Sequence, residues 1–199
     1  MSESSQKPGA RPQDETVQSL GDLALDELTA WLAARGQKPY RARQIFRWLN
    51  LKGVASFDEM SDLPARLRED LRATASCRSL TSLGAEGQER GTQKLLFRTS
   101  RGDPVEAVLI PMKGDSHTLC ISSQSGCKLG CTFCLTGALK LRGRNLSAGE
   151  IVDQWREATR ALNPDGRAPI GSIDNIVFMG MGEPLFNYRQ VVKAIALLR

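Results

Sequence analysis

The stretch that decides the fold is CKLGCTFC, residues 127–134, which sets three cysteines in the spacing C-x3-C-x2-C. Three thiolates on one short loop can hold three corners of a cubane iron–sulfur cluster. A fourth cysteine ligand is not evident, so one iron would remain open to bind a small molecule. Gly126 and Gly130 allow the loop to turn tightly around a cluster without Cβ clashes.

A structural zinc site is the main alternative for these cysteines. Zinc normally takes four ligands, as two C-x2-C-type pairs or as cysteine combined with histidine. The nearest additional ligands are Cys120 and His117, upstream on an expected strand, and His117 is the single histidine of the chain. Buried cysteines without any metal are a second alternative. The spacing favours the cluster and leaves both alternatives open.

The segments around the cysteine loop predict a parallel α/β domain. Residues 118–122 form an expected strand before the loop, and Ser147-Ala148-Gly149-Glu150 is typical of a capping-box helix start. Residues 175–179 are a continuous apolar run, as expected of a strand buried on both faces of a parallel sheet. A last helix begins near Tyr188. The order β, α, β, α favours a parallel sheet covered by helices.

Upstream of this region we expect two further units. Residues 94–98 and 104–110 flank the turn Arg101-Gly102-Asp103 and predict an antiparallel hairpin. Apolar residues at helical spacing predict three earlier helices, the first ended by Gly36, the second opened by Pro39 and the third with Pro64 in its first turn.

The expected domain plan follows from these patterns. It comprises a flexible tail at 1–16, a helical accessory domain at 17–76, a β-meander at 77–117, and the first βα units of a core at 118–199. The last residues contain no helix stop signal, and two βα units cannot cover both faces of a parallel sheet. We therefore expect the front part of a longer protein. The alternative is a small open α/β domain that ends in a helix.

Composition excludes several classes of protein. The 199 residues are 41% hydrophobic and 25% charged, which is ordinary for a globular protein. No apolar run is long enough to span a membrane, and the N-terminus has no signal-peptide h-region, so we expect a cytoplasmic protein without membrane contact. Five cysteines, three of them crowded together, do not resemble a secreted disulfide framework. The net charge of +5 permits a polyanionic partner.

Four segments, in order and spacing, resemble the RlmN family of the radical S-adenosylmethionine (SAM) superfamily. They are GQKPYRARQI at 36–45, FDEM at 57–60, TLCISSQSGC at 118–127 and MGMGEPL at 179–185. The resemblance runs from about residue 20 to the end of the chain. It implies a partial, truncated (β/α) radical-SAM barrel, preceded by a small helical accessory domain and a short antiparallel β-meander.

The resemblance also implies an activity and its partners. The family methylates C2 of adenosine in 23S rRNA and in tRNA through a methyl-cysteine intermediate, with an electron donor such as a flavodoxin. We expect a monomer. An adenine-C8 methyltransferase of the same superfamily is the nearest alternative enzyme. A zinc-stabilised RNA-binding module without catalysis is the alternative of another class.

Roles for individual residues follow from the family. Its members ligate a 4Fe-4S cluster through three cysteines, here Cys127, Cys131 and Cys134. The open iron binds SAM, and the residues that would contact this cofactor are Phe133, Gly182 and Glu183. Glu106, the only acid in an apolar strand, would be the proton acceptor, and a residue on the solvent face is the alternative for it. Cys120 would help to resolve the covalent protein–RNA intermediate.

The sequence departs from the family at one point. The partner of Cys120 is a second cysteine near the C-terminus of family members, which carries the methyl group. In this sequence no residue after Cys134 is a cysteine. We therefore expect the 199-residue chain to be inactive on its own. Cys77 matches no role in the family and is expected in the core.

A basic segment is the expected contact for RNA. From Arg35 to Phe57 the sequence holds six basic residues and no acidic residue. On a helix these cations would form a phosphate-facing surface. A second basic stretch, Lys140, Arg142 and Arg144, lies beside the cysteine loop. A solvated helix face is the alternative for the first segment.

Overall fold

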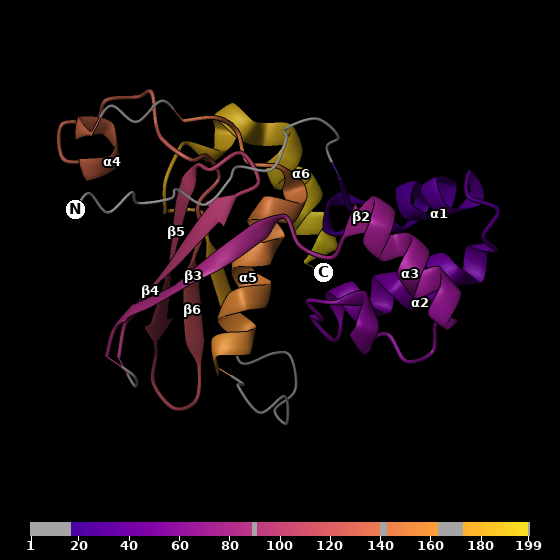
Figure 1. Ribbon diagram of the computed structural model, residues 1–199. Helices are drawn as coiled ribbons and strands as arrows, with labels where there is room; N and C mark the ends of the chain where they lie inside the picture. The colour runs from indigo at the N-terminus through magenta and orange to yellow at the C-terminus, as the bar shows by residue number, and fades with distance from the viewer. Residues whose placement is uncertain (1–16, 89–90, 140–142, 163–172, 199) are drawn as a thin grey trace, which may run out of the picture.

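A computed structural model describes residues 17–88, 91–139, 143–162 and 173–198 of the chain. The expected flexible tail, residues 1–16, lies outside the described residues. Figure 1 shows a group of helices beside a sheet, with α5 and α6 packed along the sheet. Among the described residues, no helix is long and apolar enough to cross a membrane.

The helical group contains the three helices expected from the sequence. They are α1 (Leu25–Ala33), α2 (Pro39–Asn50) and α3 (Ala65–Thr74), joined by the short 3-10 turns η1 (Leu20–Asp22) and η2 (Phe57–Glu59). Pro64 is the N-cap of α3, with extended backbone, rather than a residue of its first turn as predicted. The buried core draws on every one of these elements: Leu20, Leu28, Leu32, Ile45, Leu49, Phe57, Met60, Leu67 and Leu71.

Among the described residues, the sheet has five strands in sequence order: β3 (Leu80–Gly87), β4 (Gln93–Thr99), β5 (Pro104–Pro111), β6 (His117–Cys120) and β7 (Asn175–Val177). The first four are antiparallel neighbours, and β7 pairs in parallel with β6. The predicted hairpin is confirmed as β4 and β5. Strand β3 was not predicted, because seven of its eight residues are exposed and its sequence lacks a clear alternation.

Two long helices cover one face of the sheet. Helix α5 (Ala148–Leu162) and helix α6 (Tyr188–Leu197) bury the side chains that alternate toward them from β4, β5 and β6. The capping box at the start of α5 is confirmed. The Glu150 N–H donates to Ser147 Oγ at 3.2 Å, and the Ser147 N–H donates to Glu150 Oε2 at 2.8 Å.

Strand β7 differs from its prediction. The run 175–179 was expected to be buried on both faces, yet Asn175 is exposed, Ile176 and Val177 are half-buried, and Met179 is 80% exposed. The reason is position: β7 is the last strand in the order and pairs on one side with β6. A strand at the edge of a sheet has a neighbour on one side and is buried less than a central strand.

Buried polar contacts join the helical group to the sheet. The Arg156 guanidinium of α5 donates to Asp153 Oδ1 at 2.7 Å and to Asn50 Oδ1 of α2 at 2.7 Å, and all three residues are buried. Asp22 Oδ1 accepts a hydrogen bond of 2.5 Å from the Gly149 N–H in the first turn of α5. A short parallel pair, β1 (Gln18–Ser19) with β2 (Ala75–Ser76), closes the helical group beside this contact.

Candidate functional site

The candidate site lies where the two parallel strands β6 and β7 end. Residues 121–126 follow β6 and lead into the cysteine loop, while residues 180–183, the glycine loop, follow β7. The Met181 carbonyl accepts hydrogen bonds from the Ser123 and Gln124 N–H groups at 3.0 and 3.1 Å. The carboxyl ends of adjacent parallel strands meet at one edge of a sheet, which is where α/β domains bind ligands.

The cysteine loop, residues 126–143, is closed at its base. The Ser125 N–H donates to the Arg144 carbonyl at 3.0 Å, and the Leu146 N–H donates to the Ser123 carbonyl at 3.1 Å. A Cβ atom on Gly143 would lie 2.3 Å from Gly126 Cα, so only glycine allows this approach. The two ends of the loop are therefore in backbone contact.

The three cysteines predicted as ligands all lie on this loop. Cys127, Cys131 and Cys134 are partly exposed, and none forms a disulfide. Helix α4 (Leu135–Ala138) begins directly after Cys134, and Figure 1 shows it standing clear of the sheet. A hydrogen bond from the backbone N–H of Gly137 lowers the pKa of Cys134, which favours the thiolate that binds metal.

Three cysteine thiols are suitable ligands for an iron–sulfur cluster, but in this structure they do not converge on one point. Among the described residues, no three His, Cys, Asp or Glu side chains converge as metal ligands. This holds for the three cysteines and for the zinc alternative with Cys120 and His117. What the structure provides is a loop with a fixed base, three accessible thiols and one thiol with a lowered pKa.

The glycine loop is shaped by close packing. Gly182 has φ of 95°, and a Cβ atom there would lie 2.5 Å from the Gln124 side chain. Glu183 is the N-cap of the 3-10 turn η3 (Pro184–Asn187), and its Oε1 accepts from the Leu185 N–H at 3.0 Å. Phe133, predicted to contact the cofactor, is 92% exposed on the cysteine loop, where the apolar side chains of Leu129 and Leu135 are also exposed.

Glu106 and Cys120 lie on the sheet face opposite α5. Their strand neighbours Val105, Ala107, Leu119 and Ile121 pack into the helix-covered core, so the two residues alternate to the other face. Cys120 pairs across the sheet with Val108, two residues after Glu106.

The environments of these two side chains differ from each other. Glu106 lies on a solvent-accessible face, which is the alternative that the sequence left open for it. Its side chain is 45% exposed and lies 3.5 Å from Lys94 Nζ, because no element among the described residues covers this part of the face. Cys120 is half-buried, and burial raises the pKa of its thiol. Cys77 lies in the core as expected, where burial raises its pKa to about 12.

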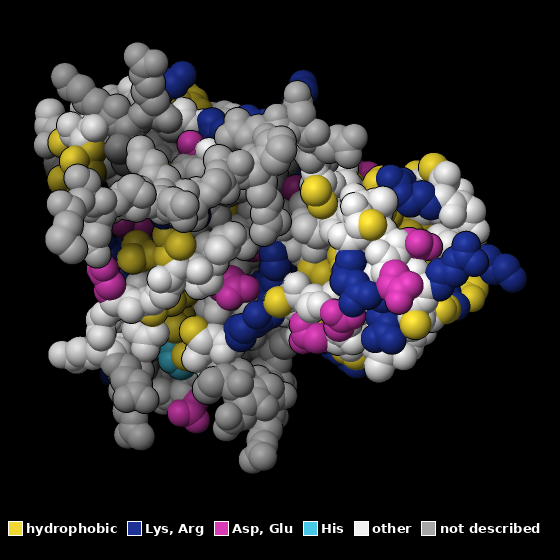
Figure 2. Space-filling model, viewed as in Figure 1, with side chains coloured by type: hydrophobic (Ala, Val, Ile, Leu, Met, Phe, Trp, Pro, Cys, Tyr) yellow, Lys and Arg dark blue, Asp and Glu magenta, His cyan; other side chains and the backbone are white. Residues whose placement is uncertain are grey.

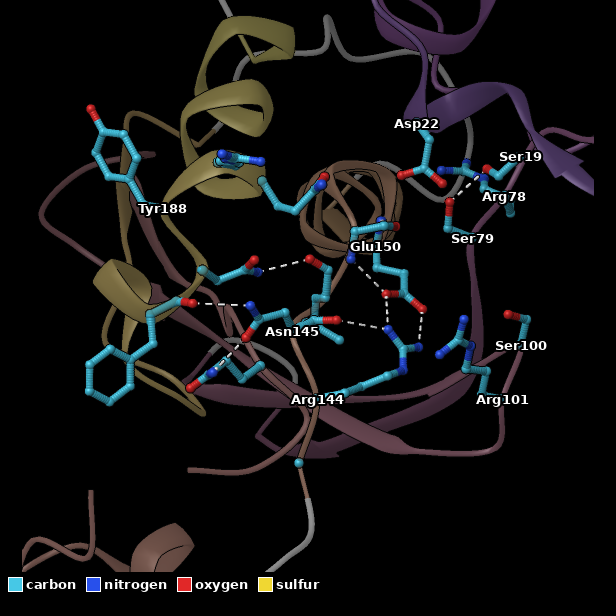
Figure 3. A pocket seen from close by; sticks show the side chains of 18 of the residues that line it. Ser19, Asp22, Arg78, Ser79, Ser100, Arg101, Arg144, Asn145, Glu150 and Tyr188 are labelled. Atoms are coloured by element: carbon cyan, nitrogen blue, oxygen red, sulfur yellow. Dashed lines mark hydrogen bonds and ion pairs between the residues drawn. The ribbon is translucent and has the colours of Figure 1, made fainter. Parts of the chain in front are cut away.

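Sequence reasoning missed a set of polar residues that hold the site together. Three side-chain amides and one guanidinium join the loop base to its neighbours: Gln124, Arg144, Asn145 and Asn187. Arg144 donates twice to Glu150, at 2.8 and 2.5 Å, as Figure 3 shows. It also donates once to Asp103, at 2.8 Å. The one available signal was the polar run Ser122–Ser125 directly after an apolar strand, where a solvated loop was equally plausible.

The basic segment is only in part a free cationic surface. Arg43 and Arg47 are exposed on α2, but Asp62 lies 3.9 Å from Arg47 and accepts from the Trp48 indole N–H at 2.6 Å. Figure 2 shows Lys and Arg side chains mixed with Asp and Glu over the helical group. Of the second basic stretch, Lys140 and Arg142 lie outside the described residues, and Arg144 is engaged at the loop base.

An open pocket of about 1270 Å³ lies between the helical group and the site. Figure 3 shows that its labelled residues come from segments far apart in the sequence. Among the described residues, five basic residues line it: Arg78, Arg101, Lys128, Arg144 and Arg189. Two acidic residues of the described chain, Asp22 and Glu150, line it as well. The pocket is therefore polar with an excess of positive charge.

The sequence of this chain is similar to those of known proteins. Residues 18–77 match the family model described as the ribosomal RNA large subunit methyltransferase N-terminal domain. The dual-specificity RNA methyltransferase RlmN of Anaeromyxobacter sp. (strain Fw109-5) is 46% identical over 196 residues, which cover 96% of this chain and 50% of that protein. RlmN of Geobacter sulfurreducens is 45% identical over 184 residues, 92% of this chain and 48% of that protein.

A solved structure agrees with the sequence comparison. The crystal structure of a radical SAM methyltransferase from Sphaerobacter thermophilus superposes with a TM-score of 0.82 at 42% identity, covering 91% of this chain and 52% of that one. The chain thus spans about half the length of the relatives it matches. The resemblance seen in the four sequence segments is confirmed: most of this chain is similar to proteins named RlmN, and its fold is similar to that of a radical SAM methyltransferase.

Proposed function

We propose that the chain forms part of a radical SAM RNA methyltransferase that methylates C2 of adenosine in 23S rRNA and tRNA. The observation that carries the proposal is the pair of hydrogen bonds to the Met181 carbonyl, which join the segment that leads into the cysteine loop to the glycine loop. Two loops that would each hold one side of a cofactor are thereby placed at one edge of the sheet. The relatives named as dual-specificity RNA methyltransferases support the reaction class.

Cys127, Cys131 and Cys134 are the residues proposed to hold a 4Fe-4S cluster. When bound, the cluster supplies the electron that cleaves a sulfonium C–S bond of SAM. The chain's own part is to provide thiolates from one loop. A backbone hydrogen bond from Gly137 lowers the pKa of Cys134, which favours the thiolate form that binds metal.

Gly182 and Glu183 are proposed to receive the amino-acid portion of SAM. The left-handed backbone at Gly182 turns the chain without a side chain, so a ligand can approach the peptide groups closely. The Glu183 carboxylate can accept a charge-assisted hydrogen bond from an ammonium group. In the structure one of its oxygens already accepts from Leu185, which orients the carboxylate. Phe133 is proposed to cover the cofactor from the loop side.

Glu106 and Cys120 are proposed to act on the substrate from the open face of the sheet. Residues on one face in diagonal register lie roughly 7–8 Å apart, so both side chains can address one nucleotide. Glu106 would accept a proton, and its carboxylate lies 3.5 Å from Lys94 Nζ. Cys120 is proposed to help resolve the covalent protein–RNA intermediate, and burial raises the pKa of its thiol.

RNA is proposed to reach the site along the pocket between the helical group and the cysteine loop. Exposed cations on α2 and the basic side chains of the pocket would contact phosphates, whose neutralisation supplies most of non-specific RNA affinity. Ribosomal and transfer RNA as substrates would place the protein in the cytoplasm. A flavodoxin-type donor and a partial (β/α) barrel are part of the same proposal.

Reductive cleavage of SAM tests the proposal. The reconstituted chain, reduced with dithionite and supplied with SAM, should produce 5′-deoxyadenosine and methionine. A variant with alanine at Cys127, Cys131 and Cys134 should produce neither. With RNA present we expect no C2-methyladenosine from the 199 residues, because none after Cys134 is a cysteine. Absence of cleavage, or equal cleavage by the variant, would overturn the proposal.

A further inference from the structure

Two buried side-chain amides meet at the base of the cysteine loop. Gln124 is 8% exposed and Asn187 is 3% exposed, and neither belongs to the residues proposed to touch cluster, SAM or RNA. Burying an amide without partners is costly, so the partners of each indicate what it holds in place.

The Gln124 amide bonds to two different loops. Its Oε1 accepts from the Glu183 N–H at 2.9 Å, and its Nε2 donates to Asn145 Oδ1 at 2.7 Å. Asn145 in turn donates to the Phe186 carbonyl at 3.0 Å, as the dashed lines in Figure 3 show. Gln124 therefore touches the glycine loop with one end of its amide and the far side of the cysteine loop's base with the other.

The Asn187 amide repeats the arrangement with both of its protons. Its Nδ2 donates to the Ser123 carbonyl and to the Leu146 carbonyl, each at 2.8 Å. Ser123 precedes the cysteine loop and Leu146 follows it, so one amide nitrogen spans the loop's two ends. Asn187 itself ends η3, the turn that Glu183 caps.

We propose that Gln124 and Asn187 are positioning residues that set the distance between the cysteine loop and Glu183. The inference rests on the proposed function, because SAM would have to reach the open iron and the Glu183 carboxylate at once. The bonds span 59 residues from Gln124 to Glu183 and 64 from Ser123 to Asn187, so no local preference produces them. A ligand that bridges two loops binds more tightly when their spacing is already set.

Hydrogen exchange on the metal-free chain tests the coupling without any cofactor. Gln124→Met keeps side-chain volume and removes both hydrogen bonds. We expect residues 126–139 and 180–186 to exchange about tenfold faster together, since two hydrogen bonds are lost. Asn187→Asp, which keeps shape and loses both donors, should do the same. The matched control is Gln190→Met, because Gln190 Oε1 also accepts from a backbone N–H, that of Ala148, but joins only α6 to α5.

A second measurement separates positioning from stability. In the reconstituted chain, Gln124→Met should retain its iron yet need about tenfold more SAM to change the cluster's electron paramagnetic resonance spectrum. Gln190→Met should need the same SAM concentration as the wild type, even where it shifts Tm as much as Gln124→Met does. Exchange that rises in one loop alone, or in neither, would overturn the inference, as would an unchanged SAM requirement. If the wild-type chain failed to bind iron, the proposed function would be refuted. The hydrogen-exchange result would then still decide whether Gln124 and Asn187 couple the two loops.

Discussion

The Ser122 hydroxyl donates a hydrogen bond to the backbone carbonyl of Glu106 at 2.5 Å. The same oxygen accepts from the Met181 N–H at 2.8 Å, and Ser122 is fully buried. One hydroxyl thus connects the strand of the proposed base, the end of β6 and the glycine loop. The geometry of the site depends on this connection as much as on the residues proposed to react.

We expect Ser122→Ala to lower the free energy of unfolding by about 1–3 kcal/mol, because it leaves the Met181 N–H and the Glu106 carbonyl buried without this partner. Ser82→Ala, at an exposed position on β3, should change it by less than about 0.5 kcal/mol. Urea denaturation of both variants measures the difference. Equal effects would mean that the hydroxyl does not hold these segments together.

The junction between the helical group and the sheet gives a second prediction. Arg156→Met leaves the fully buried Asp153 without its closest cation and should cost about 3 kcal/mol. Arg160→Met, on the same helix, removes an ion pair of 4.0 Å from a side chain that is 42% exposed and should cost less than about 1 kcal/mol. Denaturation of the two variants side by side checks this. A similar cost for both would contradict a buried ionic junction.

The pH dependence of stability reports on Asp22. Burial is the main cause that raises its pKa above 3.8, so the folded state favours the protonated form. Its contribution is present below pH 3.8 and is lost as the pH rises through the folded-state pKa. Asp22→Asn keeps an oxygen that accepts from the Gly149 N–H and removes the charge. The stability of the variant relative to the wild type should therefore increase as the pH rises from 4 to 7. Thermal unfolding across this range decides it, and a constant difference would contradict the raised pKa.

The proposed RNA contact gives a fourth prediction. Arg43→Glu on α2 should weaken binding of an RNA stem-loop and reduce the slope of log affinity against log salt by about 1, since one phosphate contact is lost. Arg66→Glu, at an exposed position on α3, makes the same change of charge outside the basic segment. Fluorescence anisotropy at several salt concentrations measures both. Identical slopes for the two variants would reduce the basic segment to a solvated face.

Features with local causes were predictable from the sequence. The start of α5 follows from Ser147 and Glu150, which cap each other within three residues. The β4–β5 hairpin follows from apolar strands around one turn. The cysteine loop was recognised because its three cysteines lie within eight residues of sequence. In each case the interacting groups are neighbours along the chain, so a pattern in the sequence can represent them.

Features that depend on distant neighbours were not predictable. The partial burial of β7 depends on what lies beyond the edge of the sheet. Asp62 neutralises part of the basic segment although it lies outside it in sequence. The bonds of Gln124 and Asn187 join residues about sixty positions apart. The identity of a polar residue does not indicate which distant residue will be its hydrogen-bond partner.

The central claim is that Cys127, Cys131 and Cys134 bind a 4Fe-4S cluster at the edge shared with the glycine loop. Iron and sulfide analysis after anaerobic reconstitution tests it most directly. We expect about four irons and four sulfides per chain, with broad visible absorbance, and loss of both when the three cysteines are replaced by alanine. Cys77→Ala, at the buried core cysteine, should leave the iron content unchanged. One tightly bound zinc in the wild type, or full iron retention by the triple variant, would contradict the account.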